Sequence, residues 1–206
     1  AFQANQRCKV WKDSVTLWIN VLNSYRDAPS VVYNNLGIAY SSIGEFERAK
    51  ANLEKSLEID PSYSPSYVNL GNLYNSIGDS KKAITLYNRA LSIERNSVEA
   101  YFNLGVVYNN IGRKEEAMKM FEKAIAIEPA HLLSYVNLIN LYEISGKQNK
   151  IAPLYEKAIA NDLDYFDAYF YAGNLYSGKN KARKAIPFYK RAIRISPDSV
   201  EAYNNL

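Results

Sequence analysis

Residues 101–129 read YFNLGVVYNNIGRKEEAMKMFEKAIAIEP, and residues 67–78 read YVNLGNLYNSIG, the same pattern displaced by 34 positions. A fixed period of this length is typical of proteins built from repeated structural units. The same spacing relates two series of tyrosines, Tyr33, Tyr67, Tyr101, Tyr135, Tyr169 and Tyr203, and Tyr40, Tyr74, Tyr108, Tyr142 and Tyr176. The units therefore span residues 30–63, 64–97, 98–131, 132–165 and 166–199, and a partial unit follows at 200–206.

Each unit predicts a pair of helices. Apolar residues at positions 4, 7, 8 and 11 of the unit follow the i, i+3, i+4, i+7 spacing of one buried helical face, and a second apolar set follows a glycine. These glycines are expected to end the first helix: Gly44, Gly78, Gly112 and Gly146. Prolines end the second helix at Pro61, Pro129 and Pro197. Because one helix pair cannot bury its own apolar face, the pairs must stack, and the predicted fold is an all-α solenoid.

Some positions depart from the repeat. A small residue stands at position 8 in most units and lets the two helices approach closely, but Ile139 replaces it in the fourth. Pro153 and Pro187 lie inside predicted second helices, where each is expected to bend its helix by removing a hydrogen bond.

Residues 1–29 predict a divergent first repeat or capping helices. Val15, Ile19 and Leu22 occupy the expected second-helix positions, and Asp13 or Ser14 is the predicted N-cap. Trp11 and Trp18 are seven residues apart on the same face.

These motifs resemble the tetratricopeptide repeat (TPR) family, whose pattern of aromatic, Leu-Gly, aromatic, Gly, Ala, aromatic, Ala and Pro is matched across residues 30–206 and best at 101–129. The resemblance implies a right-handed superhelical solenoid of helix-turn-helix repeats that binds other proteins. The segment RCKVWKDSVTLWINVL at residues 7–22, followed by these repeats, also resembles the stretch before the TPR tail of membrane-bound glycosyltransferases. That resemblance implies a substrate-presenting tail of a longer, membrane-anchored protein.

The composition is that of an ordinary globular domain, with a net charge of +4 and 22% charged residues. No apolar run is long enough to insert this segment in a membrane, and the cellular location stays open. The single histidine, His131, and the single cysteine, Cys8, are too isolated for a metal site or a nucleophile with its base. We therefore expect no catalytic residue, metal or cofactor. Nucleic acid is not an expected partner, because the tyrosines follow the spacing of buried residues.

An asparagine stripe runs along the first helices on the side opposite to the apolar face. Position 6 of the unit holds Asn35, Asn69, Asn103, Asn137 and Asn205, with Tyr171 in the fifth unit, and position 9 adds Asn72, Asn140 and Asn174. In the TPR family this face lines the concave surface, and the stripe resembles the asparagine ladder of O-linked N-acetylglucosamine transferase. An amide offers both donors and an acceptor to a peptide backbone, so the predicted site is a peptide-binding surface. The alternative interpretation is a polar helix face that keeps the protein in solution.

Two further interpretations stay open. Basic residues outnumber acidic ones between Lys147 and Arg194, which favours either an acidic partner or a solvated outer face. The partial unit places Tyr203 and Leu206 where they would dock on another copy, which predicts a homo-oligomer.

Overall fold

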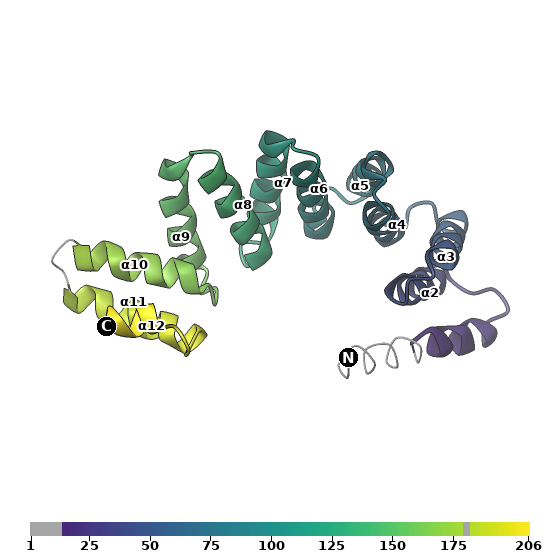
Figure 1. Cartoon of the computed structure of the whole chain (residues 1–206). Coiled ribbons are helices and arrows are strands. Elements are labelled where there is room, and N and C mark those ends of the chain that lie inside the picture. Colours follow the sequence, from purple (N-terminus) through teal and green to yellow (C-terminus); the bar gives the residue numbers. More distant parts are fainter. Residues whose placement is uncertain (1–13, 179–181) are drawn as a thin grey trace. The chain divides into compact units, whose positions relative to one another are not determined.

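The computed structural model describes residues 14–178 and 182–206, and all the regular structure in these ranges is helical (Figure 1). The chain divides into two compact units, residues 1–117 and 118–206, with the boundary inside α7. The all-α fold predicted from the sequence is confirmed. Trp11, Asp13 and Cys8 lie outside the described residues, so the expectations for them are not addressed.

The first compact unit is a series of helix hairpins. Residues 14–23 are helical. The helices that follow are α2 (Ser30–Ser42), α3 (Phe46–Ile59), α4 (Ser64–Ser76), α5 (Ser80–Ile93), α6 (Val98–Asn110) and the beginning of α7 (Lys114–Ile127). Each of α2 and α4 contacts its hairpin partner, and it also contacts the first helix of the next repeat. The first helices α2, α4 and α6 therefore lie side by side as one layer.

The second unit continues the pattern with less regularity. It contains α8 (Leu132–Ile144), α9 (Ile151–Ala160), α10 (Phe166–Gly178), α11 (Ala182–Ile195) and the short α12 (Val200–Asn204). A 3₁₀ turn at Gln148–Lys150 precedes α9. The prediction that Pro153 bends its helix is therefore wrong. Pro153 lies in the first turn of α9, where backbone N–H groups have no intrahelical partner, so its lack of an N–H removes no hydrogen bond. Pro187, by contrast, lies inside α11, as predicted.

Glycine has two distinct roles in the hairpins. The predicted helix-ending glycines have φ values of 68° to 86°, which L-residues rarely adopt, so this prediction is confirmed. Gly71 and Gly173 instead allow close contact. A Cβ atom on Gly71 would lie 2.7 Å from Cε1 of Tyr87, and one on Gly173 would lie 2.5 Å from Cε1 of Tyr189. Each tyrosine ring therefore passes directly over a glycine of the facing helix.

The helix at residues 14–23 covers the start of the array. Val15 forms a cluster with Leu36 and Ala39 of α2, and Trp18 and Leu22 pack against it. The predicted apolar face of this helix is thus the one that contacts the first repeat.

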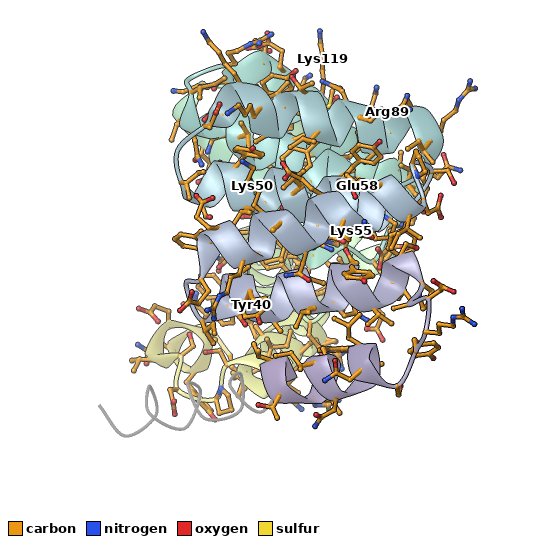
Figure 2. The ribbon with its side chains drawn as sticks, turned by 90° about the vertical axis from the view of Figure 1, so that its right-hand side faces the viewer. Tyr40, Lys50, Lys55, Glu58, Arg89 and Lys119 are labelled. Atoms are coloured by element: carbon orange, nitrogen blue, oxygen red, sulfur yellow. The ribbon has the colours of Figure 1, made fainter. Side chains whose placement is uncertain are left out.

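The second helices carry charged side chains on their outer side. Figure 2 shows Lys50, Lys55 and Glu58 on α3 and Arg89 on α5. Lys55 and Glu58 form an exposed ion pair at 2.9 Å, which contributes little to stability at this degree of exposure.

Candidate functional site

The asparagines of the first unit project from adjacent first helices. Asn35 lies on α2, Asn69 and Asn72 lie on α4, and Asn103 lies on α6. All four side chains are partly buried. Because α4 contacts both α2 and α6, these amides lie along one layer of helices.

Hydrogen bonds connect the stripe from one repeat to the next, which the sequence analysis did not anticipate. Asn103 donates to Oδ1 of Asn72 at 2.9 Å, and the hydroxyl of Tyr87 donates to the same oxygen at 2.7 Å. The same arrangement recurs in the second unit, where Asn174 accepts from Asn205 at 3.1 Å and from Tyr189 at 2.8 Å. The asparagine at position 9 therefore joins its own second helix to the first helix of the following repeat.

A buried polar network joins the first two repeats in a different way. Oδ1 of Asn34 accepts from the hydroxyl of Ser66 at 3.0 Å and from the amide of Asn69 at 2.9 Å. The hydroxyl of Ser66 is 2.7 Å from that of Ser56, which donates to the carbonyl oxygen of Ser30 at 2.8 Å. Asn34 is 3% exposed and both inner serines are fully buried, so each polar group needs such a partner.

The sequence contained a signal for this network. Asn34 stands where the next four repeats have Val68, Phe102, Val136 and Phe170, and Ser56 stands where they have Ala90, Ala124, Ala158 and Ala192. In those four repeats both positions are apolar, and in the first repeat the two polar residues are connected through Ser66. Comparing each unit with the others at buried positions would have identified them.

The inter-repeat bonds leave part of each amide available to a ligand. An asparagine has two N–H donors and an oxygen with two lone pairs. Within the described residues, Asn69 and Asn103 each use one N–H, whereas Asn72 accepts two bonds at its oxygen and keeps both N–H donors. The surface along α4 and α6 therefore retains both donors and acceptors.

The predicted residues of the second unit are less uniform. Asn137 donates back to the carbonyl oxygen of Leu133 in its own helix at 2.8 Å. Asn140 and Asn174 are exposed, and together with Tyr171 they line a pocket beside α8 and α10. Between α8 and α10 the stripe is thus continued by a concave site, whereas the linked amides return at Asn174 and Asn205.

Burial raises the pKa values of the tyrosine hydroxyls near these sites. It raises the pKa of Tyr87, which is 1% exposed, and keeps its hydroxyl a donor to Asn72. Burial, followed by the charges of Asp167 and Glu143, raises the pKa of Tyr155 to about 12.

The basic residues near the C-terminal end are mostly at the surface. Arg191 is the partner of two carboxylates, Asp162 and Asp164, each at 3.0 Å. The side chains of the other described basic residues in this stretch are exposed: Arg183, Lys184, Lys190 and Arg194.

The described residues offer little for metal chemistry. His131 hydrogen-bonds the hydroxyl of Ser134 at 2.7 Å. Across residues 14–178 and 182–206, no three His, Cys, Asp or Glu side chains are grouped so as to hold a metal ion. None of the described helices has both the length and the apolar character needed to cross a bilayer.

The sequence matches profiles of the tetratricopeptide repeat. Profiles with this description match residues 30–63, 52–85, 98–131 and 166–199, and one described as TPR repeat matches residues 71–112. The chain therefore belongs to the TPR family. No curated protein gave a significant match.

Solved TPR proteins share the fold. MamA is 27% identical with a TM-score of 0.60 over 81% of this chain and 97% of its own. YrrB, described as a TPR protein with an unusual peptide-binding site, is 23% identical with a TM-score of 0.59 over 91% and 96% of the two chains. The first TPR of Spaghetti, bound to an HSP90 peptide, is 21% identical with a TM-score of 0.54 over 57% and 93%.

Proposed function

We propose that this chain is a non-catalytic protein-binding module that holds an extended segment of another protein along the first helices of its repeats. The observation that carries the proposal is the row of partly exposed amides on α4 and α6, which keep unused donors and acceptors beside their inter-repeat bonds. YrrB and the Spaghetti repeat, whose descriptions mention a peptide-binding site and a bound peptide, support it as proteins of the same fold.

The spacing of the repeats suits an extended peptide. Packed helices lie roughly 8 to 10 Å apart, and an extended chain advances roughly 3.3 Å per residue. Each repeat therefore meets about one residue in three of the bound segment. An amide that contacts the peptide backbone does not read side chains, so specificity would come from neighbours such as Glu99 and Val106 on α6.

The expected affinity is modest. A net hydrogen bond contributes about 1 kcal/mol, and ordering a disordered segment costs about 2 to 5 kcal/mol. Because four amides contribute about 4 kcal/mol, which lies within the range of that cost, we expect dissociation constants no tighter than about 1 μM.

A random peptide display library, selected on the whole chain, tests the proposal. Selected peptides are measured by fluorescence anisotropy against the wild type and the double variant Asn69→Ala/Asn103→Ala. The variant should bind about 30-fold more weakly, because two backbone contacts of about 1 kcal/mol each are lost. The matched control is Asn52→Ala/Asn88→Ala, which removes two amides from the second helices α3 and α5 and should not change the affinity.

The substitutions also remove the inter-repeat bonds to Asn34 and Asn72, so folding must be checked separately. Circular dichroism and amide hydrogen exchange on α4 and α6 provide that check. Equal affinity of the wild type and the Asn69→Ala/Asn103→Ala variant, with helicity intact, would show that the first-helix amides are not the binding site.

A further inference from the structure

A pocket in the second unit combines aromatic rings, carboxylates and amides. Its volume is about 340 Å³. The residues around it come from α8, α9, α10 and the α9–α10 connection, and those used below are Asn140, Glu143, Tyr155, Tyr165, Asp167 and Tyr171. We call it the tyrosine–acid pocket.

The pocket coincides with two departures from the repeat pattern. In the second repeat, Tyr87 passes over Gly71 and reaches Asn72. In the fourth repeat Ile139 stands at the glycine position, is 2% exposed and fills the space over which the tyrosine would pass. Tyr155, the equivalent of Tyr87, instead places its ring centroid 5.0 Å from that of Tyr171 and 5.8 Å from that of Tyr165.

The second departure is Tyr171, which stands where the other units have an asparagine; two of these, Asn103 and Asn205, donate to the position-9 asparagine of the preceding repeat. In the first compact unit, Asn103 donates to Asn72. At the corresponding place in the second compact unit, an aromatic ring stands beside Asn140. Asn140 is exposed at the pocket. The two replacements thus turn an inter-repeat contact into an open cavity.

The electrostatics of the pocket favour a cation. Glu143 and Asp167 are exposed carboxylates, and within the described ranges neither forms an ion pair. Both are near enough to the phenols of Tyr155 and Tyr165 for their charge to raise the pKa of each, after burial. The tyrosines therefore stay neutral, and their ring faces are attractive to a positive charge.

We propose that the tyrosine–acid pocket binds the cationic side chain, arginine or lysine, of a partner protein segment. The carboxylates neutralise the charge, the rings contact the side chain, and Asn140 accepts a hydrogen bond from the cation or contacts the adjacent backbone. This inference deepens the proposed function and rests on it for the identity of the partner as a protein segment. An anionic side chain is disfavoured by both carboxylates.

The probe is the peptide acetyl-Gly-Gly-Arg-Gly-Gly-amide, with its lysine, norleucine and glutamate counterparts. Each is titrated to about 10 mM into the isotopically labelled whole chain, a range suited to millimolar affinity. Two-dimensional NMR follows the side-chain amides of Asn140 and Asn174. We expect saturable shifts there with the arginine and lysine peptides, and binding at least about fivefold weaker with norleucine or glutamate.

Two variants test the pocket itself. Asp167→Asn removes one charge, and Tyr171→Asn restores the residue that most other repeats have; each should weaken the arginine peptide about threefold to tenfold. The matched control, Asp198→Asn, removes an exposed carboxylate between α11 and α12 that does not line the pocket, and should change the affinity by no more than about 1.5-fold. Retention of helicity by circular dichroism excludes unfolding.

The results separate this inference from the proposed function. Arginine binding that is weakened in both pocket variants but not in the control supports the pocket, whatever the peptide library shows for Asn69 and Asn103. Equal binding of the arginine and norleucine peptides, or no shifts at the two pocket amides, would overturn the pocket. The peptide library result would be unaffected, because it concerns residues of α4 and α6.

Discussion

An alanine at Gly71 should disrupt the close contact between α4 and α5. A Cβ atom there would lie 2.7 Å from Cε1 of Tyr87, whereas ordinary contacts begin at 3.4 Å. The ring, which is 1% exposed, must therefore retreat by about 0.7 Å into filled space. That movement also pulls the phenol hydroxyl away from Asn72, to which it donates at 2.7 Å.

The magnitude follows from three opposing effects. Overpacking costs about 1 to 3 kcal/mol, and loss of the hydrogen bond to Asn72 costs about 1 kcal/mol. Against these, alanine is more favourable than glycine inside a helix by about 1 kcal/mol. The net expectation is a loss of about 2 kcal/mol in the stability of this hairpin.

Amide hydrogen exchange measured by mass spectrometry is the suitable assay, because it reports local stability in repeat proteins, which need not unfold in a single step. The decisive comparison is Gly71→Ala in the wild type and in a Tyr87→Ala background. Without the ring, the substitution should stabilise α4 by about 1 kcal/mol, because only the helix propensity remains. A similar loss in both backgrounds would refute the steric explanation.

Two further predictions concern the second unit. The pKa of Tyr155 is raised from 10.0 to about 12, so between these pH values the folded state retains a proton that the unfolded state loses. The contribution of this proton to the free energy of unfolding should be fully present below pH 10. It should fall by about 2 to 3 kcal/mol as the pH rises from 10 to 12. Urea denaturation of the wild type and Tyr155→Phe across this range should show a smaller fall in the variant, and identical pH profiles would contradict the assignment. Arg191→Lys should destabilise the packing of α11 against the α9–α10 connection by up to about 1 kcal/mol, because one guanidinium nitrogen contacts Asp162 and Asp164 at 3.0 Å each. The difference should vanish in about 1 M salt, and a difference that persists would indicate lost contacts of the side-chain stem instead.

The helices and their turns were predictable from the sequence because the same local pattern recurs in each repeat. The glycine at the end of each first helix illustrates this, since its positive φ follows from one residue and its neighbours. Pro153 shows the limit of such reasoning. The sequence places a proline in a helix but does not say that the chain starts a new helix two residues earlier, after a 3₁₀ turn.

The candidate site was only partly predictable. A helical wheel gives the direction in which Asn72 points, but not which side chains reach it from elsewhere. Tyr87 arrives from the next helix and Asn103 from the next repeat, so the bonding of Asn72 depends on how the helices pack. The prediction that these amides contact a peptide is compatible with that bonding but needs the binding experiment.

The departures from the repeat carry more information about specificity than the repeat itself. Where the glycine faces a tyrosine, at Gly71 and Gly173, that tyrosine donates to an asparagine, which also accepts from the first helix of the next repeat. Where Ile139 replaces glycine, no such bond is found among the described contacts of Asn140, and the ring of Tyr155 packs at a tilt against that of Tyr171 beside two carboxylates. A regular array offers the same amides at each step and so selects only an extended backbone. We therefore expect the irregular step at Ile139 and Tyr171, and not the repeated amides, to select a basic side chain.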